Sequence, residues 1–334
     1  MEHRKLGSSD LMPSVIGLGG YPFGPPLCDQ EMTARVLDKA RELGVNYIDT
    51  ADMYAQGESE TNIGAYLQDH RDDFILATKF NLSNLGDETP RQRIMRKIDE
   101  SLTKLRTDHI DLYQIHHVNP DVPAEDILGP LDELVQAGKV RYVGNCNYAS
   151  WRQMESLHVA EANNLSWFVS TQNHYNMLYR HVELEILPFC RKFNTAFIPY
   201  FPLAGGFLTG TYRPGQPPPP GSRADRVPTG MTANVRNERT EHMLLRLEGF
   251  AQEHGHTITE LALAWLLSHP EIPVIINGCE SPEHIEANVK AAEWVLTPEE
   301  RAEVDAMTSW WDGAKAAVDT TGGTTGAGAG TGRR

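Results

Sequence analysis

Four ionisable side chains stand at or just beyond the ends of short apolar runs. Asp49 follows the run Tyr47-Ile48, Lys79 closes FILATK, His116 closes DLYQIH, and Tyr54 lies in the segment just after Asp49. An adjacent ammonium lowers the pKa of a tyrosine from its ordinary value near ~10. A carboxylate paired with that ammonium keeps the ammonium charged when it is buried. His116 could then orient a substrate carbonyl or pass a proton to it. Such a set suits protonation of an oxygen while a hydride reaches the neighbouring carbon.

Each of these residues, taken singly, also has a structural explanation. A strand-end Asp or Lys is often a partner in a structural ion pair, and His117, beside His116, suits the wall of a pocket. The same pattern at the ends of three runs favours the chemical interpretation over the structural one. Asp52 lies in the same stretch, and we expect it to be a solvated loop acid.

The elements that position these residues follow from hydrophobic periodicity. Short apolar runs alternate with segments of helical period. The eight runs occupy residues 14–20, 45–50, 74–80, 109–117, 140–147, 167–173, 196–202 and 272–278. Buried strands separated by amphipathic helices predict a parallel sheet, and eight such units predict an α/β fold of the (β/α)8 TIM barrel class. Polar residues at the C-terminal ends of barrel strands then converge on one active-site mouth.

Three segments depart from this repeat. The lead-in RKLGSSDLMPSV has a Ser-Ser-Asp turn between extended pieces, which predicts an N-terminal β-hairpin capping the barrel bottom. Residues 212–230 are too rich in Pro and Gly for helix or strand, and so long a loop is typically functional or mobile. We assign residues 1–312 to the barrel domain and residues 313–334 to a disordered Gly/Thr-rich tail.

Composition narrows the class of function. The 334 residues are 40% hydrophobic and carry a formal net charge of −15, which disfavours nucleic acid and anionic membrane partners and favours a small-molecule substrate. The four cysteines are scattered, without a CxxC pair or a nearby His, so we expect reduced thiols and no metal site. Without a signal peptide or an apolar span we expect a cytoplasmic protein. The oligomeric state has no sequence signal.

The ordered motifs of this chain resemble those of the aldo-keto reductases. The matching segments, in family order over residues 3–308, are RKLGSSDLMPSVIGLGGYPFG, NYIDTADMYAQGESE, ATKF, IDLYQIHH, KVRYVGNCNY, TQNHYN, IPYFPLAGGFLTGTY and SPEHIEANV. The resemblance implies a barrel that binds a nicotinamide dinucleotide without a Rossmann domain and interconverts a carbonyl and an alcohol by hydride transfer. It implies that Tyr54 is the general acid or base, with Asp49, Lys79 and His116 as its partners.

The resemblance also implies a set of cofactor contacts. Asn147 and Gln172 correspond to holders of the nicotinamide carboxamide, and Tyr200 to the ring that stacks on the nicotinamide. The implied cofactor-binding residues are Gly20, Tyr21, Asp49, Asn147, Gln172, Tyr200, Phe201, Leu203, Gly206, Cys279, Glu280, His284 and Asn288. For the substrate we expect contacts from Tyr21, Phe23, Met53 and His117, together with the Pro-rich loop or Trp310 and Trp311.

The cofactor end departs from the family pattern in this sequence. Cys146 and Phe201 each replace a Ser that is common in the family. Glu280 stands where many relatives carry an Arg or Lys that pairs with the 2′-phosphate of NADPH. A carboxylate there would repel that phosphate and could accept hydrogen bonds from a ribose diol. The family resemblance favours NADP(H), and Glu280 makes NAD(H) the alternative.

Three functions remain open at this point. The first is an NAD(P)(H)-dependent oxidoreductase acting on an aldehyde, ketone or sugar, with Tyr54 as general acid or base. The second is a regulatory subunit that keeps the barrel, senses the cofactor and turns over little; the presence of all four catalytic residues disfavours it. A barrel with lyase or isomerase chemistry is the third, which the amide pair Asn147 and Gln172 disfavours.

Overall fold

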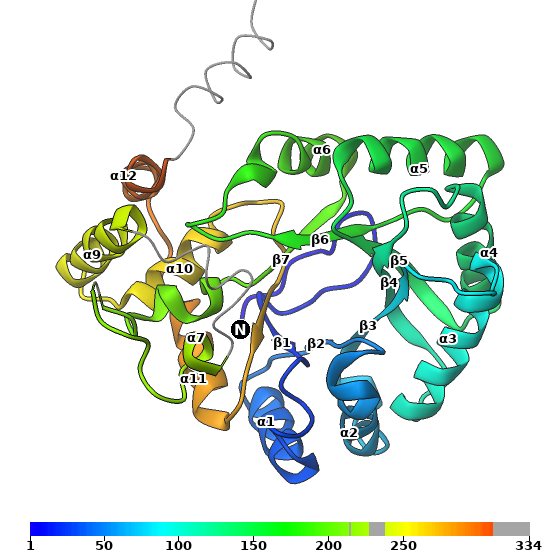
Figure 1. Ribbon diagram of the computed structural model, residues 1–334, viewed down its shortest axis with the longest axis horizontal. Coiled ribbons are helices and arrows are strands. Elements are labelled where there is room, and N and C mark those ends of the chain that lie inside the picture. The colour runs from blue at the N-terminus through cyan, green and yellow to red at the C-terminus, as the bar shows by residue number, and fades with distance from the viewer. Residues whose placement is uncertain (214, 227–237, 310–334) are drawn as a thin grey trace, which may run out of the picture.

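A computed structural model describes residues 1–213, 215–226 and 238–309 of the chain. Within these residues, eight parallel strands are hydrogen-bonded in the order β7-β6-β5-β4-β3-β2-β1-β8 (Figure 1). The strands are β1 (Ile16–Gly19), β2 (Tyr47–Asp49), β3 (Ile75–Leu82), β4 (Ile110–Val118), β5 (Val140–Cys146), β6 (Ser170–His174), β7 (Ala196–Tyr200) and β8 (Ile275–Gly278). β7 packs against β8, so the barrel is nearly closed and the predicted (β/α)8 architecture is confirmed.

Helices cover the outer face of this barrel (Figure 1). The described α-helices are α1 (Gln30–Glu42), α2 (Glu58–Leu67), α3 (Pro90–Leu105), α4 (Glu125–Gln136), α5 (Ser150–Asn163), α6 (Ile186–Phe193), α7 (Arg223–Arg226), α9 (Glu238–Glu253), α10 (Ile258–Leu267), α11 (Pro282–Ala291) and α12 (Pro298–Thr308), of which the short α7 lies in a loop beside the barrel mouth. Capping boxes fix where several begin; at α3, for example, the Thr89 side chain accepts from the Gln92 N–H and the Gln92 side chain accepts from the Thr89 N–H.

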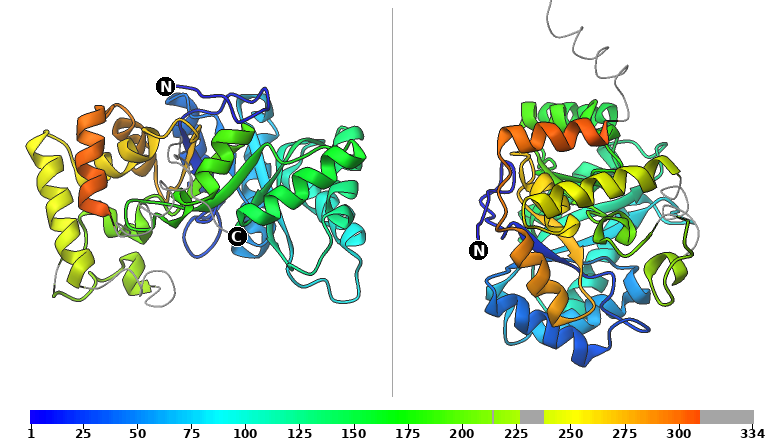
Figure 2. Two further views of the ribbon diagram at one scale, coloured as in Figure 1. Left: turned by 90° about the horizontal axis from the view of Figure 1, so that it is seen from above. Right: turned by 90° about the vertical axis from the view of Figure 1, so that its left-hand side faces the viewer.

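The N-terminal segment lies across one end of the barrel (Figure 2). The Arg4 N–H donates to Pro13 O at 3.0 Å and the Leu6 N–H to Leu11 O at 2.9 Å, and strand pairing is limited to one antiparallel bridge between His3 and Ser14. Leu6 and Leu11 join the apolar cluster inside the barrel. The segment is therefore an irregular hairpin that plugs the barrel bottom, where the sequence predicted it.

The long connection between β7 and β8 holds most of the irregular structure. It begins with the 3-10 helix η4 (Ala204–Thr209) and later forms α7, which corrects the expectation that residues 212–230 hold no helix. Residues 222–226 contain no Pro or Gly, and the Gly221 N–H donates to the Asp225 carboxylate at 2.8 Å, so this short stretch is free to turn helically. Residues 214 and 227–230 of this loop lie outside the described residues.

The C-terminal boundary predicted from sequence lies beyond the last described helix. α12 ends at Thr308, and residues 310–334, including Trp310, Trp311 and the Gly/Thr-rich tail, lie outside the described residues. Within the described part of the chain, the helices are too short or too polar to cross a membrane.

Candidate active site

A large pocket opens at the C-terminal ends of the barrel strands. Its volume is about 460 Å³, which suits a small-molecule site. The lining residues are Gly19, Tyr21, Pro22, Asp49, Tyr54, His116, His117, Cys146, Asn147, Gln172, Tyr200, Phe201, Pro202, Leu203, Gly205, Gly206, Thr209, Arg226, Ile276, Asn277, Gly278 and Glu280. The strand-end placement agrees with the location of active sites in barrels of this class.

A buried ion pair lies at the floor of the pocket. Lys79 Nζ donates a short hydrogen bond to Asp49 Oδ1, a second to Thr50 O at 2.9 Å, and a third to Tyr54 Oη at 3.4 Å. Lys79 and Asp49 are fully or almost fully buried. Asp49 ends β2 and Lys79 lies on the adjacent β3, so the register of the sheet itself sets this contact. The structure thus brings Asp49, Lys79 and Tyr54 together.

The second oxygen of Asp49 is held by two glutamines. Gln114 Nε2 and Gln172 Nε2 each donate to Asp49 Oδ2 at 3.0 Å, and both side chains are buried. Gln114 was missed by the sequence reasoning. Its position in the sequence could have indicated its place at the site, because Gln114 lies two residues before His116 on β4 and residues two apart on a strand share a face. Since Gln172 is engaged here, its side chain supports Asp49 as well as lining the pocket.

A strained turn carries Tyr54 to the ion pair. Tyr54 begins the 3-10 helix η1 (Tyr54–Gly57), and Ala55, Gln56 and Gly57 all have positive φ, at 47°, 58° and 94°. Non-glycine residues rarely adopt this conformation, and it is found at functional sites when the surrounding structure enforces it. The turn reverses the chain within a few residues, so the phenol points back at Lys79.

Asp52, in the same connection, corrects one expectation. Its carboxylate is buried rather than solvated, and Lys97 Nζ of α3 lies 3.0 Å from Asp52 Oδ2. The Asp52 N–H also donates to Lys79 O at 3.0 Å. Asp52 therefore ties the Tyr54 segment to β3 and α3, a role that depends on a residue 45 positions away and that local sequence does not reveal.

The pocket sets the protonation of its ionisable groups. Burial raises the pKa of Tyr54, while the Lys79 ammonium opposes this rise without cancelling it. Burial alone would lower the pKa of Lys79, but Asp49 and then Tyr54 raise it above its ordinary value. Burial, followed by repulsion from Lys79, lowers the pKa of His116 to about 3. Near neutral pH the site therefore holds a protonated phenol, a charged lysine and a neutral imidazole.

The expected nicotinamide contacts gather beside this group. Tyr200 Oη donates to Asn147 Oδ1 at 2.9 Å, and Asn147 Nδ2 donates to His116 O at 3.3 Å. The Tyr200 ring stacks on His174 with centroids 5.5 Å apart and an interplanar angle of 12°. Within the described residues, the buried Asn277 Nδ2 has no hydrogen-bond partner, although Asn277 lines the pocket. An unpaired buried donor fits a site that receives a polar ligand.

The far part of the pocket joins the segments after β7 and β8. Leu203 and Gly206 of the η4 region line it, and so does Glu280. Arg226 of α7 also lines it, and sequence reasoning missed this residue because a single basic residue in a Pro-rich loop carries no positional signal. Arg226 Nη2 donates to Glu280 Oε1 at 3.0 Å.

Three residues that the sequence predicted as cofactor contacts lie outside the pocket lining in this region. Cys279 and Asn288 are buried, and Asn288 Nδ2 donates to Cys279 Sγ at 3.4 Å. His284 is exposed, and its Nδ1 accepts from the Glu280 N–H at 3.2 Å. These side chains hold the loop between β8 and α11 in shape.

Three other expected residues also lie outside the pocket lining. Phe23 is fully buried in the core between the barrel and its helices. Met53 is 54% exposed, and Gly20 donates its N–H to Asp49 O at 2.7 Å. The structure brings Tyr21 and His117 to the pocket instead, so the expected substrate contacts of Phe23 and Met53 gain no support from position.

Comparison with known proteins gives consistent matches along the chain. The aldo/keto reductase family model matches residues 15–309. A Schizosaccharomyces pombe protein provisionally named a voltage-gated potassium channel subunit beta is 32% identical, covering 90% of this chain and 92% of that protein. The Bacillus subtilis protein named uncharacterized oxidoreductase YrpG is 31% identical, and the match covers 90% of this chain and 93% of that protein. Versiconal hemiacetal acetate reductase of Aspergillus parasiticus is 30% identical, and the match covers 90% of this chain and 95% of that protein.

Proposed function

Since this chain belongs to the aldo/keto reductase family, we propose that it transfers a hydride between NAD(P)(H) and a carbonyl or alcohol, with Tyr54 as general acid or base. Oxidoreduction of a carbonyl or an alcohol follows from the family itself, and relatives named as an oxidoreductase and a reductase agree with it. The observation that carries the proposed mechanism is the placement of Tyr54 Oη 3.4 Å from Lys79 Nζ in the pocket.

The bound nicotinamide supplies or accepts the hydride, and the residues of the chain control the proton. Asn147, Gln172 and Tyr200 all line the pocket; the first two would hold the nicotinamide carboxamide, and Tyr200 would contact the nicotinamide ring. In the reducing direction Tyr54 donates its proton to the carbonyl oxygen as negative charge develops there. Lys79 stays charged because Asp49 pairs with it, so its ammonium stabilises the phenolate that Tyr54 becomes.

His116 acts on the substrate as a neutral imidazole. Its pKa, lowered to about 3, leaves no proton to give as an acid near neutral pH. A neutral ring still has one N–H donor, which can hold the carbonyl oxygen beside Tyr54. The His116 and Tyr54 rings meet edge to face with centroids 5.7 Å apart, so one substrate oxygen can contact both.

The test of this mechanism is the Tyr54→Phe variant. We expect turnover of a probe aldehyde, 4-nitrobenzaldehyde, with NADPH or NADH to fall about 10²- to 10⁴-fold, because the proton donor is lost while the ring remains. Dinucleotide binding, followed by tryptophan fluorescence, should change less than about twofold. Tyr66→Phe is the matched control, since the Tyr66 hydroxyl contacts Asp38 outside this pocket. Undiminished turnover by Tyr54→Phe would overturn the proposed role.

A second candidate role is that of a cofactor-sensing regulatory subunit. This role is favoured only by the name of one relative, a potassium channel subunit beta. Catalysis is favoured instead by the meeting of four side chains at one site: Asp49, Lys79, Tyr54 and His116. Negligible turnover of wild type across aldehydes, ketones and sugars, together with a partner whose affinity follows the redox state of the cofactor, would reverse this preference.

A further inference from the structure

Two oppositely charged side chains meet across the pocket where the segments after β7 and β8 face each other. Arg226 Nη2 lies 3.0 Å from Glu280 Oε1, and Arg226 Nη1 lies 3.5 Å from Glu280 Oε2. Both residues line the pocket, and their side chains are 40% and 34% exposed. The two residues come from α7 and from the loop before α11, so the fold and not the local sequence creates the pair.

This pair changes the electrostatics that Glu280 alone would impose. An isolated carboxylate would repel a phosphate at this part of the pocket, as the sequence suggested. With Arg226 alongside, the local charge of the two side chains sums to zero. The cation that the family resemblance implies at the Glu280 position is thus supplied here by Arg226, from the opposite segment of the pocket.

The geometry and exposure of the pair leave the guanidinium available to a ligand. An arginine has five N–H donors in a planar fork, and the contacts with Glu280 use two of its nitrogens. A partly exposed ion pair is held weakly, so exchange of its partner costs little. A phosphate monoester carries more negative charge than a carboxylate and accepts the same bidentate contact.

We propose that Arg226 selects NADP(H) by pairing with the 2′-phosphate, and that Glu280 limits this selectivity by competing for the guanidinium. When the phosphate is absent, Glu280 keeps its pairing with Arg226, and its remaining lone pairs can accept hydrogen bonds from the ribose diol of NAD(H). The inference rests on the proposed dinucleotide-dependent function and deepens it by naming the residues that set cofactor preference. The chain then accepts both dinucleotides, with NADP(H) bound more tightly.

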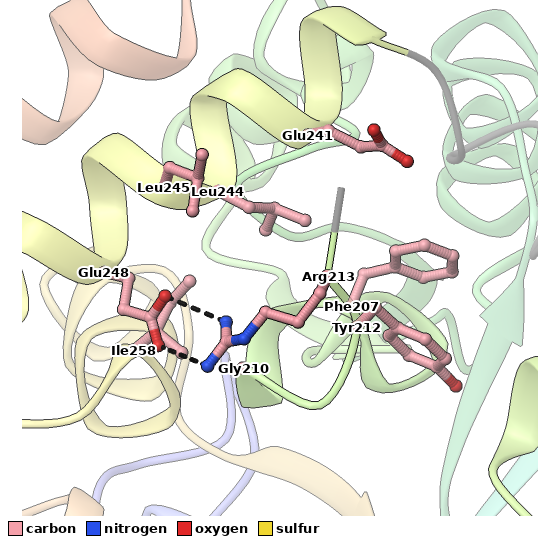
Figure 3. Close-up of a pocket in the computed structure, with 9 residues that line it drawn as sticks. All are labelled: Phe207, Gly210, Tyr212, Arg213, Glu241, Leu244, Leu245, Glu248 and Ile258. Atoms are coloured by element: carbon pink, nitrogen blue, oxygen red, sulfur yellow. Dashed lines mark hydrogen bonds and ion pairs between the residues drawn. The ribbon is translucent and has the colours of Figure 1, made fainter. Parts of the chain in front are cut away.

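The experiment compares binding of NADPH and NADH, followed by tryptophan fluorescence, in full-length wild type, Arg226→Gln and Glu280→Gln. Arg213→Gln is the matched control. Figure 3 shows Arg213 paired with Glu248 in a small separate pocket. The two terminal nitrogens of Arg213 donate to the Glu248 carboxylate at 2.9 and 3.1 Å. Its side chain is 45% exposed, close to that of Arg226. Competition by 2′,5′-ADP and by 5′-AMP isolates the contribution of the 2′-phosphate.

The proposal expects Arg226→Gln to raise the NADPH dissociation constant about tenfold or more, while NADH binding changes less than about twofold. Glu280→Gln should tighten NADPH and weaken NADH, and Arg213→Gln should leave both unchanged. Equal effects of Arg226→Gln on the two dinucleotides, or no effect, would overturn Arg226 as selector while leaving the proposed function standing. If wild type binds neither dinucleotide, the proposed function and the selector both fail. Melting temperatures confirm that the variants are folded.

Discussion

Burial and the charge of Lys79 have opposite effects on the pKa of Tyr54. The sequence predicted that Lys79 would lower the phenol pKa, and its ammonium does act in that direction. Burial has the larger effect, so the net pKa of Tyr54 lies above 10.0. A group that keeps its proton near neutral pH suits the proposed role of an acid that protonates the carbonyl oxygen, and the nearby charged lysine would stabilise the phenolate that follows.

The pH profile of carbonyl reduction should report these pKa values. In the proposed mechanism reduction needs protonated Tyr54, whose raised pKa would delay the loss of activity until the pH exceeds the ordinary value of 10.0. His116 is neutral at any pH well above about 3, and Lys79 stays charged. We therefore expect kcat for reduction to be level from about pH 6 to about pH 9. A fall centred near pH 6 to 7 that vanishes in His116→Asn would contradict a neutral His116.

The meeting of the proposed catalytic residues was predictable because strand ends in a barrel share one edge. Asp49, Lys79 and His116 each end an apolar run, and this position alone predicts a common mouth. Gln114 and Arg226 were missed for different reasons. Gln114 sits inside an apolar run and looks like core, while Arg226 reaches the pocket only through the path of a long loop.

At the scale of elements, the connection from β2 to α2 is held by a neighbouring helix. Asp52 is buried beside Lys97 of α3, and Lys97 Nζ also lies 3.1 Å from Glu100 Oε2. The turn after Asp52 contains three consecutive residues of positive φ, and the two that are not glycine, Ala55 and Gln56, store strain. The contact with α3 therefore helps to keep the phenol of Tyr54 aimed at Lys79.

Lys97→Met tests this support. It leaves the buried Asp52 carboxylate without its cation, so we expect a loss of about 1–3 kcal/mol in unfolding free energy, measured in urea. With Tyr54 less firmly held, kcat should fall several-fold while cofactor binding is kept. Lys139→Met is the control, because Lys139 pairs with Asp99 at 2.6 Å on the exposed surface and should cost less than about 1 kcal/mol. Equal losses in the two variants would show that the contact with Asp52 has no special weight.

The strands were easier to predict than the connections between them. A run such as FILATKF carries its own signal in continuous apolarity, and β3 spans Ile75–Leu82 accordingly. The helix α7 was not predicted, because it is four residues long and depends on the Asp225 cap at Gly221. The turn at Tyr54 was also beyond sequence reasoning, since Ala55 and Gln56 have no intrinsic preference for positive φ.

At the scale of the whole molecule, the two ends of the barrel have opposite tasks. The upper end keeps polar groups around an open pocket, while the lower end is closed by Leu6 and Leu11 packed against side chains such as Tyr47 inside the barrel. The closing segment passes near the starts of β6 and β7. Stability and chemistry are therefore separated along the barrel axis, and changes at the bottom should alter folding more than turnover.

Gly7→Ala tests that separation. Gly7 has φ of 54°, and an added Cβ would press on Val169 O and lie 2.7 Å from Ala196 N, both backbone atoms that cannot turn aside. We expect a loss of about 3 kcal/mol or more in unfolding free energy, with dinucleotide affinity retained at temperatures where the variant is folded.

Gly86→Ala separates the clash from the backbone conformation. Gly86 has a similar φ of 58°, but an added Cβ would meet nothing within 4 Å, so only the conformational cost of about 1 kcal/mol applies. The difference between the two variants in urea denaturation measures how tightly the N-terminal hairpin is seated against the barrel. Equal destabilisation would mean that the hairpin yields to the added methyl group and does not close the barrel bottom firmly. A larger loss in Gly7→Ala would instead show that the plug is part of the barrel core, because its contacts with β6 and β7 would be what the methyl group breaks.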